Sequence, residues 1–193
     1  MKFDYPEGAT PLNADEVHNL IPRHLTTQHE LNEWEQFNIV QAEQWLFRRK
    51  KKDIYSLEFV QKLHHKMFDK TWKWAGEFRK TQTNIGVHSV YIAQELKKLF
   101  GDVCYWNDHN VYSIREIAVR LHHRLVFIHP FPNGNGRFSR LFADFVAISN
   151  NQPRFSWGTG SLTKDGVVRK LYIEALKEAD NFYYSKLIQF ADS

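Results

Sequence analysis

Apolar side chains recur at the period of an α-helix through most of this 193-residue chain, and this pattern limits its fold more than any other feature. Between residues 113 and 129 the apolar positions fall on one face of a helix. They are Ile114, Ile117, Ala118, Leu121, Leu125 and Ile128. A longer pattern of the same kind runs from about Gln28 to Arg49. Its apolar stripe comprises Leu31, Trp34, Ile39, Ala42, Trp45 and Leu46. The periodicity predicts a mainly α protein.

Helix starts and breaks give the expected domain organisation. Asn13 followed by Glu16 is typical of a helix N-terminus and predicts a short helix over Ala14–Leu20. Further helices are expected from Ser56, over Gln94–Trp106, over Ser113–His129, after Lys164 and near Asn181–Phe190. The length suits one domain, and no repeat or linker divides the chain. We therefore expect an N-terminal extension over residues 1–27 and a single domain over residues 28–193.

The stretch from Thr83 to Ile92 departs from the helical pattern. It is rich in β-prone residues, namely Ile85, Val87, Val90, Tyr91 and Ile92. Gly86 and Ser89 tolerate the backbone of a turn. This combination predicts a short β-hairpin between two helices.

The composition excludes several classes of protein. The single cysteine, Cys104, excludes an intramolecular disulfide and a CxxC metal site. The first residues lack the apolar segment of a signal peptide. No apolar run approaches the roughly 20 residues that cross a bilayer. We therefore expect a cytoplasmic protein that does not bind a membrane.

The chain is mildly basic, with a formal net charge of +4 and a pI of about 9.1. Its most visible run of charge is Arg48–Lys52. One interpretation is a patch for nucleic acid or phosphate. The other is a solvated helix C-terminus, where cations oppose the negative end of the helix dipole. We favour the second, because no aromatic cluster or recognition helix follows the run.

The residues that indicate chemistry lie between two predicted helices, where residues 129–137 read HPFPNGNGR. A glycine-rich loop that leads into a helix N-terminus is an anion site, because its backbone N–H groups are unpaired and the helix dipole favours negative charge. Gly134 and Gly136 let the backbone approach the anion. Arg137 and Arg140 supply two guanidinium groups that can meet a polyphosphate.

His129 closes the helix on the other side of this loop. A histidine beside a phosphate site is suited to be the general base for an incoming hydroxyl. Together these features indicate the transfer of a phosphorus-centred group.

Residues 129–140 resemble the Fic motif, HxFx(D/E)GNGRxxR, and fit it at every defined position except Asn133. Residues 72–79, which read WKWAGEFR, resemble the segment that leads into the flap of Fic proteins, and residues 83–92 resemble the flap itself. The resemblance covers most of residues 30–180 and is nearest to the group called mobile mystery protein B. It implies a single Fic-type helical domain with a short β-hairpin flap.

The resemblance implies a protein adenylyltransferase (AMPylator), which transfers AMP from ATP to a Tyr, Thr or Ser hydroxyl of a target protein. His129 would deprotonate that hydroxyl. Gly134, Asn135 and Gly136 would hold the α- and β-phosphates. Arg137 would pair with the β-phosphate, and Arg140 would pair with the γ-phosphate. Some members of the family transfer other nucleotides, phosphocholine or a phosphoryl group, so these reactions stay open.

Asn133 departs from the motif, because Fic proteins usually have Asp or Glu there to hold Mg²⁺ between the phosphates. An asparagine keeps a carbonyl oxygen but lacks the negative charge that Mg²⁺ prefers. We therefore expect Mg²⁺ to bind with ATP, and Asn133 to be at most a weak metal ligand.

Two further roles follow from the resemblance. The flap residues Ile85, Gly86 and Val87 would dock an extended segment of the target, although the same residues could form a purely structural hairpin. Glu30 would be the inhibitory glutamate of Fic proteins and would pair with Arg140. Thr27 and Glu30 also fit a plain capping box at the start of a helix, and both roles can hold together because a capping glutamate can still be reached by an arginine.

A second hypothesis belongs to another class of function. Asn133 could mark a degenerate Fic domain that binds nucleotide and a partner protein without turnover. Proteins of the group that this chain resembles are encoded beside a helix-turn-helix protein, so a DNA-binding partner is one expectation, and a second copy of the chain in a homodimer is another. We favour the enzyme, because a binding module has no need of a base at His129.

Overall fold

The computed structural model describes residues 18–49, 52–159, 162 and 166–193. Within these ranges the chain forms seven α-helices, and the mainly α prediction is confirmed. The helices are α2 (Gln28–Phe47), α3 (Leu57–Phe68), α4 (Ile92–Asp108), α5 (Ile114–Ile128), α6 (Asn135–Ile148), α7 (Val167–Asp180) and α8 (Ser185–Asp192). A short 3₁₀ helix, η1 (Ser89–Tyr91), leads into α4. None of the helices in the described ranges is both long and apolar enough to cross a membrane.

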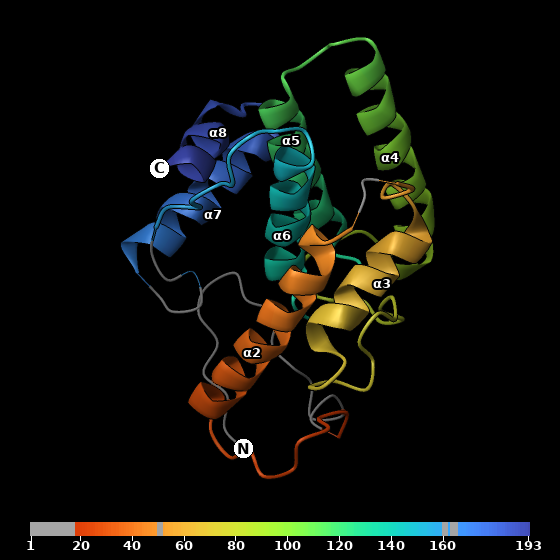
Figure 1. Ribbon diagram of the computed structural model, residues 1–193, viewed down its shortest axis with the longest axis vertical. Coiled ribbons are helices and arrows are strands. Elements are labelled where there is room, and N and C mark those ends of the chain that lie inside the picture. The colour runs from red at the N-terminus through yellow and green to blue at the C-terminus, as the bar shows by residue number, and fades with distance from the viewer. Residues whose placement is uncertain (1–17, 50–51, 160–161, 163–165) are drawn as a thin grey trace.

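Helices α5 and α6 lie side by side at the centre of the molecule (Figure 1). Helix α4 packs along α5, while α2 and α3 pack against each other and against α6. Helices α7 and α8 cover the other side of α5 (Figure 1). The buried aromatic face of α6 consists of Phe138, Phe142 and Phe145. The loop between α5 and α6, which carries the HPFPNGNGR sequence, therefore starts and ends on the two most enclosed helices.

The helix starts use the residues that the sequence indicates. The Ser56 side chain accepts a hydrogen bond from the amide of Phe59, and the Ser113 side chain accepts one from the amide of Glu116. Such N-caps satisfy amides that have no partner within the helix. Most of the short helix expected over Ala14–Leu20 lies outside the described residues.

The predicted β-hairpin over residues 83–92 is wrong. Residues 81–88 form an irregular loop, and Ser89–Tyr91 turn directly into α4. The backbone groups of the loop find partners elsewhere: the amide of Val87 donates to the carbonyl of Ile128 at 3.4 Å, and the carbonyl of Val87 accepts from the Arg79 side chain. Because these groups bind the end of α5 and a buried guanidinium, they are not available for a cross-strand ladder.

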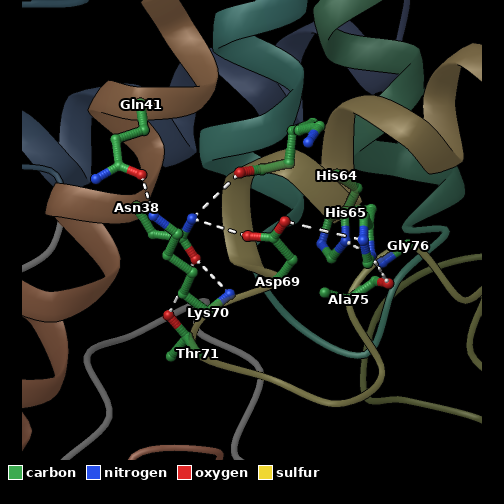
Figure 2. Close-up of polar contacts among 10 residues, drawn as sticks. Asn38, Gln41, His64, His65, Asp69, Lys70, Thr71, Ala75 and Gly76 are labelled. Carbon is green, nitrogen blue, oxygen red and sulfur yellow. Dashed lines mark hydrogen bonds and ion pairs between the residues drawn. The ribbon is translucent and has the colours of Figure 1, made fainter. Parts of the chain in front are cut away.

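Helix α2 is fixed on the end of α3 by one buried amide (Figure 2). The Asn38 Nδ2 donates to the Asp69 carboxylate at 3.2 Å, and its Oδ1 accepts from the backbone amide of Lys70 at 3.0 Å. The Thr71 hydroxyl donates to the same Oδ1 at 3.4 Å. A side chain that satisfies both donors and acceptors at a helix end fixes the register of its own helix. It thereby fixes Glu35, which lies one turn earlier on α2.

The interior contains four buried histidines, and we expect them to destabilise the fold in acid. Burial is the largest cause that lowers the pKa of His64 to about 3 and that of His129 to about 4, and it also lowers the pKa of His122 and His123. The unfolded chain binds these protons near pH 6.5, whereas the folded chain binds them only at lower pH. The free energy of unfolding should therefore fall below about pH 6.5, by about 1.4 kcal/mol per pH unit for each histidine protonated only in the unfolded chain.

Urea unfolding between about pH 7 and about pH 5 measures this slope, in a range where most carboxylates stay ionised. A free energy of unfolding that stays constant across this range would contradict the expectation.

Candidate active site

His129 is the C-cap of α5 and has a left-handed backbone, with φ 54° and ψ 61°. Its side chain is buried, with 6% of the residue exposed, and it lines a large cavity. Burial, helped by the positive charge of Arg79, lowers the pKa of His129 to about 4. The Nδ1 lies 3.3 Å from the carbonyl of Val126, so this nitrogen carries the proton and the lone pair lies on Nε2. His129 is therefore neutral at pH 7 and able to accept a proton at Nε2.

The loop after His129 is fastened to the core by Phe131, which is fully buried. The Phe131 ring stacks on the His64 ring with 3.6 Å between the ring centres. The His64 Nδ1 accepts a hydrogen bond from the amide of Gly76 at 3.0 Å, so its Nε2 is the protonated nitrogen and donates to the carbonyl of Asn133 at 3.1 Å. One neutral histidine on α3 thus holds both the ring and the backbone of the loop.

The side chain of Asn135 closes the same loop from within. Its Oδ1 accepts from the amide of Phe131 at 2.9 Å, and its Nδ2 donates to the carbonyl of Phe131 at 2.8 Å. Both polar atoms of this buried side chain are therefore used by the loop. The phosphate contact that we expect from Asn135 is accordingly left to its backbone N–H.

The first turn of α6 lies at the cavity, and its backbone N–H groups have no acceptor within the helix. Gly134 is the N-cap, with φ 79°, and the first bond within the helix runs from the amide of Phe138 to the carbonyl of Gly134 at 2.9 Å. The amides of Asn135, Gly136 and Arg137 precede that bond, and all three residues line the cavity. Such amides, at the positive end of the helix dipole, form an anion site.

Gly134 and Gly136 differ in what an added Cβ would meet, which gives a matched pair of substitutions. A Cβ at Gly134 would lie 2.5 Å from the Phe68 ring, at a positive φ. A Cβ at Gly136 would have the flexible end of Arg140 as its nearest contact, at 3.5 Å. We expect Gly134→Ala to lower the free energy of unfolding by about 1–3 kcal/mol and Gly136→Ala to change it by less than about 0.5 kcal/mol. Equal losses of unfolding free energy in the two variants, measured by urea unfolding, would contradict the proposed difference between the two glycines.

The two arginines of the motif are oriented by different neighbours. The Arg137 guanidinium lies over the Phe68 ring, 5.0 Å from its centre, and its Nη1 is 2.6 Å from the Glu35 carboxylate. The Arg140 guanidinium lies 5.7 Å from the centre of the Tyr172 ring. The Tyr172 hydroxyl in turn contacts the buried His122, 3.1 Å from its Nε2. Both guanidinium groups are therefore held at the cavity wall by an aromatic ring.

Glu35, on α2, is a site residue that the sequence reasoning missed. Only 4% of it is exposed, and its second oxygen accepts a hydrogen bond from the Trp72 indole at 2.7 Å. A signal exists in the sequence, because Glu35 is one turn from Leu31 and Ile39 on the apolar stripe of its helix. A carboxylate on a buried face requires a partner. Here the partner is Arg137, from a segment far along the chain.

Glu30 and Arg140 both lie in the described part of the chain, and they do not form the expected contact. The Glu30 carboxylate accepts hydrogen bonds from the amides of Thr26 and Thr27, at 2.7 and 3.0 Å. These bonds lower the pKa of Glu30 and complete a capping box at the start of α2. Glu30 lines a separate shallow hollow with Trp34, outside the large cavity. The capping interpretation of Glu30 is therefore confirmed.

The large cavity has a volume of about 570 Å³ and brings the remaining candidates together. It is lined by His129, Asn133, Gly134, Asn135, Gly136, Arg137, Arg140, Ile85, Gly86 and Val87. Part of the wall belongs to α7, which contributes the apolar residues Ile173 and Leu176 and the cationic Arg169. This wall was not among the sequence expectations. The cavity thus combines cationic side chains and helix-start amides with apolar side chains, as a nucleotide requires.

The donors for a metal ion are few at this site. Asn133 is the residue at the metal position of the motif, and its Oδ1 accepts a hydrogen bond from the amide of Gly134 at 2.6 Å. Across the described residues, no group of three or more His, Cys, Asp or Glu side chains is arranged to hold a metal ion. A single neutral oxygen fits a Mg²⁺ ion only if phosphate and water supply most of its ligands.

The pattern of the Fic/DOC family matches residues 54–147. The chain contains a Fic/DOC family domain. The match begins just before α3 and extends almost to the end of α6, so it includes the loop that starts at His129.

Curated relatives of this Fic chain are named as protein adenylyltransferases. The protein adenylyltransferase fic-1 of Caenorhabditis elegans is 30% identical over 112 residues, which are 54% of this chain and 21% of that protein. The protein adenylyltransferase Fic of Nematostella vectensis is 33% identical over 82 residues, which are 41% of this chain and 19% of that protein. The Fic chain thus spans about a fifth of the length of these relatives.

Solved structures share the Fic fold over nearly the whole chain. BepC of Bartonella tribocorum, solved with bound AMPPNP, has a TM-score of 0.70 at 18% identity and is matched over 97% of this chain and 93% of that one. An N-terminal Fic domain from Bartonella quintana with bound ADP has a TM-score of 0.69 at 17% identity, over 97% and 92% of the two chains. At such identities the likeness establishes the fold.

Proposed function

We propose that this chain is a protein adenylyltransferase, which transfers AMP from ATP to a Tyr, Thr or Ser hydroxyl of a target protein. One observation carries the proposal: the neutral His129 and the first-turn amides of α6 line the same cavity. The names of the curated relatives support the reaction. The AMPPNP and ADP in the similar structures support a nucleotide as the ligand.

The geometry suggests how the chain's own residues would act. The triphosphate would lie against the amides of Asn135 and Gly136, with Arg137 and Arg140 neutralising its charge. The target hydroxyl would give its proton to Nε2 of His129 as its oxygen attacks the α-phosphorus. A new oxygen–phosphorus bond forms, the bond from the α-phosphorus to the bridging oxygen breaks, and pyrophosphate leaves. Most of the acceleration would come from positioning and charge neutralisation.

The remaining cavity surfaces suggest where the other groups lie. The apolar walls of α5 and α7, with Val126, Phe127 and Leu176, would take the nucleobase. Ile85, Gly86 and Val87 also line the cavity, so we retain this flap as the docking surface for the target. The flap would act as a loop held in place by its contacts with the rest of the fold, because the segment does not form a hairpin.

Mg²⁺ would enter with ATP, and Asn133 would be its one weak ligand from the chain. When bound, the ion would neutralise charge between the phosphates. Asn133→Asp adds a negative charge at this position, so we expect the half-saturating Mg²⁺ concentration for transfer to fall by about tenfold. A magnesium titration of the labelling rate measures this change. An unchanged half-saturating concentration would remove Asn133 from the metal site.

We further propose that Glu35 inhibits the enzyme. Its carboxylate occupies Arg137, the guanidinium that would otherwise pair with a phosphate. Asn38 and Trp72 hold α2 and the carboxylate in this place. Nucleotide binding would therefore have to break a buried ion pair, which is costly unless another anion replaces the carboxylate.

The reaction is tested by incubating the chain with ATP labelled at either the α- or the γ-phosphate. Transfer of the α-label to protein, with mass spectrometry locating AMP on a hydroxyl, would support the proposal. Transfer of the γ-label alone would identify a phosphoryl transferase and overturn it. The Glu35→Gln variant should be included, because Glu35 would suppress the wild-type reaction.

The occupied Arg137 and the uncharged Asn133 also favour a second candidate function. In this alternative the chain is a degenerate Fic domain that binds nucleotide and a partner without turnover. The partner could be a helix-turn-helix protein or a second copy of the chain. Nucleotide binding by Glu35→Gln in calorimetry, with no label transferred from either phosphate, would support this alternative.

A further inference from the structure

Arg79 is a buried cation whose guanidinium binds backbone carbonyls. Only 3% of the residue is exposed. Its Nε donates to the carbonyl of His129 at 2.6 Å, and its Nη1 donates to the carbonyl of Thr81 at 3.0 Å. Its Nη2 donates to the carbonyl of Val87 and lies 3.4 Å from that of Ile128. Burial lowers the pKa of Arg79, but a guanidinium remains charged at pH 7.

The four acceptors belong to two segments that are far apart in the sequence. Thr81 and Val87 lie in the loop over residues 81–88 that carries the flap residues, whereas Ile128 and His129 are the end of α5. The backbone amide of Arg79 adds a fifth contact, to the carbonyl of Pro130 at 2.9 Å. Arg79 is therefore the joint between the flap and the residue that we propose as the base.

The flap depends on this joint because it lacks the ladder of a hairpin. One direct hydrogen bond to α5 runs from the amide of Val87 to the carbonyl of Ile128, at 3.4 Å. Gly86 lies so close to the joint that an added Cβ would meet the Cβ of His129 at 2.6 Å and Nη2 of Arg79 at 2.8 Å. The backbone of the flap thus rests directly on the proposed base.

The charge of Arg79 has two effects at this position. It faces the last carbonyls of α5, where the helix dipole is negative, so a cation is favourable even without a carboxylate beside it. It also lies near the imidazole of His129 and contributes to the neutral state of that ring. A lysine would keep the charge. Its three N–H donors share one nitrogen, however, so they cannot replace a planar guanidinium whose three nitrogens reach four carbonyls.

We propose that Arg79 is a positioning residue: it fastens the flap to His129, so that a target segment lying on the flap presents its hydroxyl to Nε2 of that histidine. Arg79 is not among the residues that line the cavity, so it acts through the flap and the base. The inference rests on the proposed transfer reaction for its catalytic consequence. The joint itself is a property of the fold and can be measured without any reaction.

The test compares Arg79→Lys, which keeps the charge but loses the fork, with Arg79→Gln, which loses both. Lys80→Gln is the matched control, because Lys80 is the exposed neighbour in the sequence. In both Arg79 variants we expect amide exchange of Val87, the flap amide that donates to the carbonyl of Ile128, to accelerate by at least about tenfold, while α5 and α6 stay protected. The titration of His129, followed by NMR, should move to higher pH in Arg79→Gln and much less in Arg79→Lys.

In the Glu35→Gln background, self-labelling with α-labelled ATP measures the catalytic consequence. Arg79→Lys should lower the maximal rate by about tenfold or more and leave the half-saturating ATP concentration within about threefold. Unchanged flap exchange in Arg79→Lys would overturn the joint. Accelerated exchange with an unchanged labelling rate would overturn the positioning role. If flap exchange accelerates but no variant ever transfers label, the contact between the flap and His129 is supported and the proposed function is refuted.

If Arg79→Lys fails to fold, Gly86→Ala tests the same contact from the other side. The added methyl group would push the flap away from His129 and Arg79 without removing the guanidinium. The same acceleration of exchange and the same loss of labelling rate are expected. A Gly86→Ala chain that keeps the wild-type rate and exchange would show that the close seating of the flap has no role in positioning.

Discussion

Replacing His129 with alanine should lower the transfer of α-labelled AMP by roughly 10²–10⁴-fold, which is the usual contribution of a general base. The imidazole is neutral at pH 7 because burial and the nearby Arg79 lower its pKa to about 4. The bond from Nδ1 to the carbonyl of Val126 leaves Nε2 as the proton acceptor. Among the other described side chains that line the cavity, the arginines cannot accept a proton, and the Glu35 carboxylate is already bound by Arg137 and Trp72.

The loss should be confined to the chemical step. Calorimetry with a non-hydrolysable ATP analogue should give an affinity within about threefold of the parent chain, because the amides of α6 and both arginines are untouched. The measurement belongs in the Glu35→Gln background, where the site is expected to be open. A His129→Ala chain that still transfers label at the parent rate would refute the assignment of the base. One that no longer binds nucleotide would show that the residue holds the site together.

Replacing Glu35 with glutamine should raise both nucleotide affinity and the rate of transfer by about tenfold or more. The substitution removes the charge that holds Arg137 but keeps an oxygen that can accept from the Trp72 indole. In the parent chain, nucleotide must compete with a buried carboxylate for this guanidinium, and a difference of about 1.4 kcal/mol already changes the affinity tenfold. Titration of each chain with ATP or its analogue, followed by labelling, measures the gain.

Glu30→Gln is the matched control for this experiment. Both glutamates lie on α2, but Glu30 is exposed and bound to Thr26 and Thr27 at the helix start. Its substitution should cost a little helix stability and leave nucleotide affinity unchanged. If Glu30→Gln gained activity and Glu35→Gln did not, the ion pair with Arg137 would be irrelevant to inhibition. If neither gained, the chain would lack inhibition from α2.

Local sequence patterns were enough to predict most helices and the location of the anion site. The N-caps at Ser56 and Ser113 were readable because capping depends on residues within one turn. The loop from His129 to Arg137 was readable for a related reason: its glycines and the following helix start lie in one continuous segment. Such features follow from short-range sterics and hydrogen bonding.

The flap was mispredicted because its β-prone residues form only a weak local preference. In the fold, the carbonyls of Thr81 and Val87 turn to Arg79, and the residues from Ile92 onward join α4. Partners supplied from outside the segment thus decided its structure. Gly86 is likewise constrained from outside its own segment, because a Cβ added there would meet His129 and Arg79.

The sequence by itself determined that this chain is helical and that it carries a Fic loop with His129 at one end and two arginines at the other. Only the tertiary structure decided that Glu35, instead of Glu30, meets an arginine, and that Arg79 joins the flap to His129. The physical reason is distance along the chain. Helical period and capping act over a few residues, whereas a buried charge takes its partner from whichever helix or loop the packing brings beside it.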